Sequence, residues 1–214
     1  MNETIPSAGP WNYSLEDSRY DCNYLTSDST VIDFGGYKGE FAFKIQEKYK
    51  CNVYVYEPMN EYCDDMEKYK NPKVHINRFS VGSHTGTEEI AIEGEGTTFE
   101  KYGRRENNSH KGEPNKLIIE APSIIIDVVD ILSVMKNYDT IDLMKINIEG
   151  AEFDILPQLI SSGEINKVEN LQVQFHSFVE GAYDNYKLIK EQLSKDYDIV
   201  LDSLWKWTFW TKKK

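Results

Sequence analysis

Short apolar runs alternate with amphipathic segments through the first third of the chain. Phe41, Ala42, Ile45 and Tyr49 lie near helical spacing, whereas the runs on either side are β-branched and aromatic, as is typical of strands. The predicted strands are Thr30–Phe34, Asn52–Glu57 and Lys73–Val81, and the predicted helices are Gly39–Lys50 and Asn60–Lys70, with Asn60 as N-cap. This alternation indicates a parallel sheet with crossover helices.

The middle of the chain is more polar, and alternation then resumes. Two strand-like pieces, Glu88–Ile92 and Lys116–Glu120, flank a long loop at about 94–114, which we expect to be mobile and to lie on the substrate side. The segments that follow are predicted as a helix at Ile126–Asn137, a strand at Ile141–Glu149, a helix at Gly150–Gly163, a strand at Asn170–Phe178, a helix at Tyr183–Asp196, and a closing antiparallel pair at Tyr197–Leu204 and Lys206–Lys212. We therefore expect an N-terminal arm at 1–29 and one domain at 30–214.

Composition narrows the possible partners. The chain has 214 residues, of which 40% are hydrophobic, enough for one sizeable core. Its net charge of -12 disfavours nucleic acid and anionic membranes as partners. Three cysteines without a CxxC motif predict neither a disulfide framework nor a zinc site. With no apparent signal peptide or bilayer-spanning run, we expect a cytoplasmic protein.

The stretch VIDFGGYKGEF lies where the first strand meets the first helix. It reads D-x-G-G-x-x-G, with Asp33 before Gly35, Gly36 and Gly39. Phe34 occupies the first glycine position of the dinucleotide fingerprint, so that motif does not fit, and no P-loop is present. A carboxylate at this place suits a cationic amine or sulfonium ligand. A tight turn that needs glycines only for packing is the alternative.

A second acid follows at the end of the next strand. The run VYVYEP places Glu57 about 20 residues beyond the glycines, the offset at which such folds hold ribose hydroxyls with an acid. The two features together favour a ligand site at the carboxyl ends of the strands.

These stretches, and above all LMKINIEGAEFDIL at Leu143–Leu156, resemble the FkbM family of S-adenosylmethionine-dependent methyltransferases, in which D-x-G-A-N-x-G, E-P and K-I-D-V-E-G-A-E are usual. The resemblance implies an α/β, Rossmann-like class I methyltransferase fold with a mostly parallel seven-stranded sheet, flanking helices and an antiparallel last strand. It also implies S-adenosylmethionine as cofactor and S-adenosylhomocysteine as product.

The resemblance also implies the cofactor-binding positions. Those expected around the amino-acid half of the cofactor are Asp33, Gly35, Gly36, Tyr37 and Gly39; those around the ribose are Glu57 and Pro58; and those beside the adenine are Phe79, Ser80 and Val81. Three positions depart from the family pattern: Gly36 replaces Ala, Tyr37 replaces Asn, and Asn147 replaces Asp. The last change removes a carboxylate that a hard cation would want, so a divalent metal has no support and no metal ligand is predicted.

Catalytic candidates lie at the carboxyl ends of the predicted strands Ile141–Glu149 and Asn170–Phe178. Lys145, Asn147 and Glu149 alternate, so we expect them to share one strand face. His176, on the same face as Gln174, is the first choice of general base. A histidine that is merely bonded to a neighbouring loop is the alternative.

The resemblance favours a hydroxyl acceptor on a sugar or glycan, such as the deoxyhexoses rhamnose and fucose, with a glycosyltransferase as an associated or fused partner. Aromatic side chains of the arm and tail suit sugar rings, and the arginines of the loop suit an anionic group. The predicted substrate residues are Trp11, Tyr13, Thr98, Tyr102, Arg104 and Arg105, with Trp205, Trp207 and Trp210 as further aromatic candidates. A non-sugar metabolite as acceptor, or a binding module without chemistry, are the alternatives.

Overall fold

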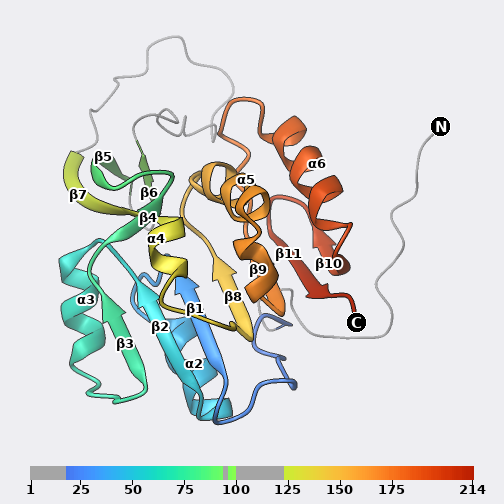
Figure 1. Cartoon of the computed structure of the whole chain (residues 1–214). Coiled ribbons are helices and arrows are strands. Elements are labelled where there is room, and N and C mark those ends of the chain that lie inside the picture. Colours follow the sequence, from blue (N-terminus) through green and yellow to red (C-terminus); the bar gives the residue numbers. More distant parts are fainter. Residues whose placement is uncertain (1–17, 94–95, 100–122) are drawn as a thin grey trace, which may run out of the picture.

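The computed structural model describes residues 18–93, 96–99 and 123–214, and for 92–93 and 96–99 it describes the backbone (Figure 1). A central sheet crosses the molecule, with helices on both faces and a smaller sheet at the carboxyl ends of the central strands. The predicted strand Lys116–Glu120 lies outside the described residues.

The central sheet has seven strands in the order β10-β11-β9-β8-β1-β2-β3. All its pairings are parallel except those of β11, which is antiparallel to both β9 and β10. The bounds are β1 Thr30–Phe34, β2 Asn52–Tyr56, β3 Val74–Asn77, β8 Leu143–Ile146, β9 Asn170–Val173, β10 Tyr197–Ser203 and β11 Trp207–Lys212. The mostly parallel sheet, its antiparallel last strand and the closing pair at its edge are confirmed.

Strand order reverses at β1, which pairs with β2 on one side and with β8 on the other. Such a switch point leaves a crevice outside the carboxyl ends of the strands, where ligands bind in open α/β sheets. The glycine turn that follows β1 therefore lies at the place where the fold accommodates a ligand.

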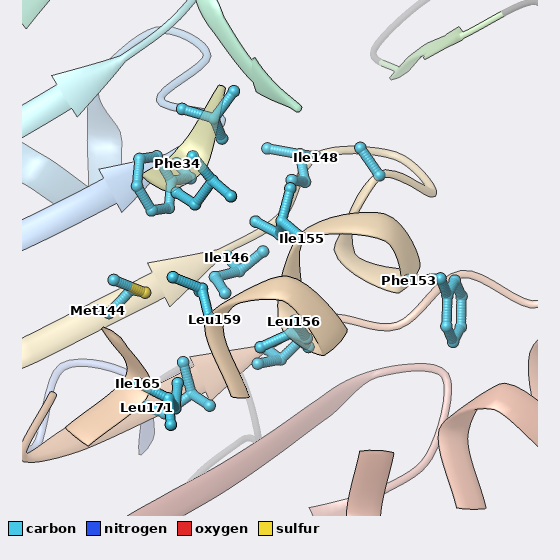
Figure 2. Close-up of a cluster of buried hydrophobic side chains, with 14 of the residues drawn as sticks. Phe34, Met144, Ile146, Ile148, Phe153, Ile155, Leu156, Leu159, Ile165 and Leu171 are labelled. Carbon is cyan, nitrogen blue, oxygen red and sulfur yellow. The ribbon is translucent and has the colours of Figure 1, made fainter. Parts of the chain in front are cut away.

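Alternating side chains of the central strands fill two cores. In β1, Val31 faces the cluster of α2 and α3, whereas Ile32 and Phe34 face the cluster of α4, α5 and α6. The helices are α2 Glu40–Tyr49, α3 Asn60–Glu67, α4 Ile131–Met135, α5 Glu152–Ser162 and α6 Ala182–Leu193, and a 3-10 turn spans Glu164–Lys167. Figure 2 shows part of the second cluster, which contains Ile155, Leu156 and Leu159 of α5 together with Met144 and Ile146 of β8.

Part of the predicted arm belongs to this architecture. Cys22 and Leu25 are buried in the α2–α3 cluster. The backbone N–H of Cys22 donates to the Tyr49 hydroxyl at 2.7 Å, and Gln172 of β9 donates to the carbonyl of Arg19. Residues 18–29 therefore pack along the α2 face of the central sheet.

The second sheet was not foreseen from the sequence. Its order is β4-β7-β5-β6, with β4 Ser80–Gly82, β5 Gly86–Glu93, β6 Gly96–Phe99 and β7 Ser123–Asp130. The single strand predicted at Lys73–Val81 is wrong: β3 ends at Asn77 in the central sheet and β4 begins at Ser80 in the second. The helix predicted at Ile126–Asn137 is wrong as far as Asp130, because that stretch pairs with β4 and β5 as β7.

Three boundaries also differ from prediction. The strand predicted at Ile141–Glu149 is shorter in the structure, where it is β8, and the strand predicted at Asn170–Phe178 is likewise shortened to β9. In both cases the polypeptide leaves the sheet soon after the carboxyl end of the strand. Asn60 is the first residue of α3 rather than its cap, since the N-cap is Met59, which makes no side-chain cap hydrogen bond. Ligand-facing residues beyond Ile146 and Val173 therefore lie on loops, not on strand faces.

The core account predicts a contrast between two leucines on neighbouring helices. Leu159→Ala removes a fully buried side chain of α5 and should lower the free energy of unfolding by about 2–5 kcal/mol. Leu188→Ala on α6, where the side chain is 58% exposed, should change it by no more than about 0.5 kcal/mol. Urea unfolding followed by circular dichroism measures both, and equal losses would contradict the assignment of α5 to the core.

Candidate active site

The turn after β1 requires its glycines for internal packing. Gly35 has φ +79°, and a Cβ there would lie 1.8 Å from the carbonyl oxygen of Asn147. A Cβ on Gly36 would lie 2.1 Å from Val55, and Gly39, at φ +82°, is the N-cap of α2 and lies against Met66. The tight-packing explanation thus accounts for all three glycines, and close backbone approach by a ligand is not needed to explain them.

A buried ion pair lies beneath this turn. The Lys145 Nζ of β8 donates to Asp33 Oδ1 of β1 at 2.7 Å and to the carbonyl oxygen of Gly35 at 2.7 Å. Asp33 and Lys145 are register neighbours in adjacent strands, and both are buried on the α2 side, where Lys145 lies over the Phe41 ring. Burial raises the pKa of the Asp33 carboxyl, although Lys145 opposes the shift.

Glu57 reaches back to the same turn. Its Oε2 accepts the backbone N–H of Tyr37 at 2.8 Å, and its Oε1 accepts that of Met59 at 2.9 Å. Burial raises the pKa of this carboxyl to about 7, while the two backbone donors oppose the shift. Asp33 and Glu57 therefore lie at the same edge of the sheet, as the predicted site requires.

Tyr37 adopts a strained backbone conformation. Its φ is 50°, in the left-handed region that Asn tolerates better than a bulky aromatic residue. Its ring meets that of Tyr62 edge-on, with centroids 4.6 Å apart, and Lys38 lies over both rings. The departure from the family's usual Asn thus places an aromatic pair beside Glu57.

A cavity of about 240 Å³ opens at this edge. The predicted site residues that line it are Gly35, Tyr37, Glu57, Pro58, Ser80, Asn147 and Glu149. Residues that line it but were not predicted are Tyr56, Tyr62, Ile90, Ile126 and Ile148. Ile90 and Ile126 come from β5 and β7, so the second sheet supplies an apolar wall that local sequence patterns cannot reveal.

The turn after β8 brings two glutamates to His176. Glu149, at φ 54°, lines the cavity, and its Oε2 lies 3.3 Å from His176 Nε2. On the other side of the ring, Nδ1 lies 2.8 Å from Oε1 of the fully buried Glu152. The prediction missed Glu152, although its position in the E-G-A-E stretch was a signal.

The shared strand face predicted for Lys145, Asn147 and Glu149 is wrong, because β8 ends at Ile146. Lys145 points to the α2 side, whereas Asn147 and Glu149 line the cavity from the following loop. The Oδ1 atom of Asn147 is buried and has no hydrogen-bond partner within the described part of the chain. Buried acceptors without a partner are uncommon in folded proteins.

Other predicted residues lie outside the cavity lining. Asp33, Gly36 and Gly39 support the turn from behind, Phe79 packs against Tyr56, and Val81 is in the core. Trp207 and Trp210 are 2% and 1% exposed, so neither offers a face to a sugar. Trp205 is partly buried against the same core as Trp210.

Most of the predicted substrate residues lie outside the part of the chain that the structure describes. Trp11, Tyr13, Tyr102, Arg104 and Arg105 lie outside the described residues, and for Thr98 the structure gives the backbone of β6 alone. Their part in acceptor binding stays a prediction.

Two searches of the described chain concern other kinds of site. Across 18–93, 96–99 and 123–214, no group of three or more His, Cys, Asp or Glu side chains is arranged to hold a metal ion. In the same ranges, no helix is both long enough and apolar enough to cross a bilayer.

Comparison with solved structures defines the class. An rRNA methylase from Streptococcus thermophilus matches with a TM-score of 0.55 at 9% identity, covering 96% of this chain and 100% of that one. The protein SMU.1697c from Streptococcus mutans, solved in complex with SAH, matches with a TM-score of 0.51 at 10% identity, covering 95% and 100%. The fold is that of class I S-adenosylmethionine-dependent methyltransferases.

Family membership follows from the sequence itself. The methyltransferase FkbM domain matches residues 33–204, and the chain belongs to that family. A curated relative named Methyltransferase 1, from Beauveria bassiana, is 24% identical over 65% of this chain. The match spans 62% of that relative's length, less than two thirds.

Glu57 should make stability depend on pH. Its raised pKa means that the folded state binds more protons than the unfolded state between about pH 4.5 and 7, so stability is highest below this range and falls as pH rises through it. The loss should be on the order of 3 kcal/mol. Urea unfolding at pH 5, 6, 7 and 8 should show a smaller decline for Glu57→Gln than for wild type.

The control for this prediction is Glu61→Gln, which makes the same change at an exposed position in α3. It should keep the wild-type pH dependence, to which Asp33 contributes in all three proteins. A Glu57→Gln profile parallel to wild type would show that Glu57 titrates as an ordinary carboxyl.

Proposed function

We propose that this chain transfers a methyl group from S-adenosylmethionine to a hydroxyl of a sugar or glycan. The observation that carries the proposal is one cavity that joins the glycine turn, the acid at the end of β2 and Glu149 after β8. The family match supports methyl transfer. The acceptor class rests on the chemistry of the lining and on the family resemblance.

The residues present fit this methyl donor. Glu57 would accept ribose hydroxyls with the lone pairs that its two backbone hydrogen bonds leave, with Pro58 beside the ribose and Ser80 beside the adenine. Gly35 and Asn147 line the cavity where the amino-acid half of the cofactor would lie, and the Oδ1 atom of Asn147 has no hydrogen-bond partner among the described residues. The carboxylates of Glu57 and Glu149 give the cavity the charge that a cationic ligand requires.

When bound, the sulfonium supplies an activated methyl group. The protein's own task is to align the acceptor oxygen with that methyl and to remove the hydroxyl proton. Glu149 supplies a carboxylate to the cavity lining from the turn after β8, next to Asn147 and Ile148. The apolar side chains of Ile90 and Ile126 in the lining limit the room for water in the cavity.

The acceptor is best matched by a neutral hydroxylated ring. Tyr37 and Tyr62 both line the cavity, and aromatic rings suit the apolar faces of a sugar such as rhamnose or fucose. The net charge of -12 disfavours an RNA acceptor, although some solved structures of this fold are rRNA methylases. A glycosyltransferase partner would supply such an acceptor.

Calorimetry with S-adenosylhomocysteine tests the proposal directly. Wild type should bind at micromolar concentration, and Glu57→Gln should bind at least about 10-fold more weakly, because a charge-assisted hydrogen bond contributes about 1.5–3 kcal/mol. Glu61→Gln, with the same change outside the cavity, should bind as wild type does. An absence of heat with folded wild-type protein would refute the methyl-donor site.

A panel of hydroxyl acceptors with labelled methyl donor then tests the acceptor class. We expect methylation of deoxyhexosides such as those of rhamnose and fucose. Labelling of phenols alone would replace the sugar acceptor by a small aromatic metabolite while leaving the methyltransferase assignment intact.

A further inference from the structure

Glu152 connects two loops at the cavity edge. Its Oε2 accepts the backbone N–H of Gly150 at 2.9 Å, and its Oε1 accepts the backbone N–H of His176 at 2.9 Å. The side chain is fully buried in the first turn of α5. A buried carboxylate is costly unless it is hydrogen-bonded, and here both oxygens are engaged.

The same carboxylate orients the imidazole of His176. Nδ1 lies 2.8 Å from Glu152 Oε1, so a proton on Nδ1 is shared with Glu152 and Nε2 is directed to Glu149 Oε2, at 3.3 Å. The titratable side chains that contact the ring are thus Glu149, from the turn before α5, and Glu152, from α5 itself. Phe178 lies against the ring, with centroids 5.4 Å apart.

Exposure ranks the three groups. The Glu149 side chain is 20% exposed, that of His176 is 9% and that of Glu152 is 0%. Glu149 lines the cavity, whereas His176 and Glu152 lie behind it. The group that can touch an acceptor is therefore Glu149, and both nitrogens of His176 face protein carboxylates.

The backbone at Glu149 supports a functional reading. A φ of 54° is strained for a residue with a side chain, and such strain persists where the surroundings impose it, frequently at active sites. Here the hydrogen bond from Gly150 N–H to Glu152 holds the turn. The strained conformation places the Glu149 carboxylate between the cavity and His176.

We propose that Glu149 is the general base of the transfer, that His176 is a positioning residue that accepts the proton from Glu149, and that Glu152 is a positioning residue that orients the imidazole. The inference rests on the proposed function. It replaces the expectation that His176 itself takes the proton from the acceptor, because no ring nitrogen faces the cavity.

The step balances. The acceptor O–H bond breaks, its oxygen gains the methyl group as the S–CH3 bond breaks, and the S–C electron pair stays on sulfur as a neutral thioether. The hydroxyl proton passes to Glu149 and from there to the lone pair of His176 Nε2. The resulting imidazolium lies between two carboxylates, Glu149 and Glu152, which stabilise its charge.

NMR of protein with 15N-labelled histidine tests the arrangement without an acceptor. The chain has four histidines, and His176→Asn assigns the relevant ring. In S-adenosylhomocysteine-bound wild type we expect an exchange-protected Nδ1 proton, lost in Glu152→Gln, and an Nε2 nitrogen shift that changes in Glu149→Gln. Ring signals unaffected by either substitution would overturn the proposal.

Kinetics on the best acceptor of the panel separates catalysis from structure. Glu149→Gln should lower kcat by about 100-fold or more, with little change in KM or in S-adenosylhomocysteine affinity. Glu152→Gln and His176→Asn should lower kcat by about 10-fold. Glu191→Gln, an exposed position of α6, is the matched control.

The outcomes distinguish the two proposals. If folded wild-type protein does not bind S-adenosylhomocysteine, the proposed function is refuted. Retained binding with an unchanged kcat in Glu149→Gln would refute the base alone, and a loss confined to KM would assign Glu149 to acceptor binding instead. If no acceptor reacts, the Nε2 shift in Glu149→Gln decides.

Discussion

The ammonium group of Lys145 fixes the glycine turn that lines the cavity, because it binds the carboxylate of Asp33 and the carbonyl oxygen of Gly35 at once. The pair is fully enclosed, and a buried charge deprived of its partner costs about 3–5 kcal/mol. Gly35 also donates to the carbonyl of Tyr56 and leaves room for the carbonyl of Asn147. The ends of β1, β2 and β8 thus meet in one backbone arrangement that contacts within the protein hold in place.

The two carboxylates of the cavity lining, those of Glu57 and Glu149, each lie against other groups of the protein. Glu57 is held by the N–H groups of Tyr37 and Met59, and Glu149 Oε2 lies 3.3 Å from His176 Nε2. Burial raises the pKa of Glu57 to about 7, a shift that a cationic ligand would oppose. The second sheet adds the apolar side chains of Ile90 and Ile126 to the cavity lining, beside the carboxylates of Glu57 and Glu149.

Much of this arrangement was predictable from local patterns. Val31, Ile32 and Phe34 identify a buried strand, and the acid and glycines after it mark a turn at the sheet edge. The second sheet was not predictable, because Ile126–Asp130 was assigned to a helical period and the partners that make it a strand lie about 40 residues earlier, in β5. The roles of Asn147, Glu149 and His176 depend on loops beyond β8 and β9, where strand periodicity no longer applies. Glu152 was missed because a helical glutamate is normally exposed, and its burial depends on His176, 24 residues away.

A crystal structure of the protein with S-adenosylhomocysteine tests the central claim most directly. The account predicts ribose hydroxyls within hydrogen-bond distance of Glu57, the amino-acid half against Gly35 and Asn147, and the sulfur on the side of Glu149. A ligand bound elsewhere, or one whose sulfur points away from Glu149, would contradict it.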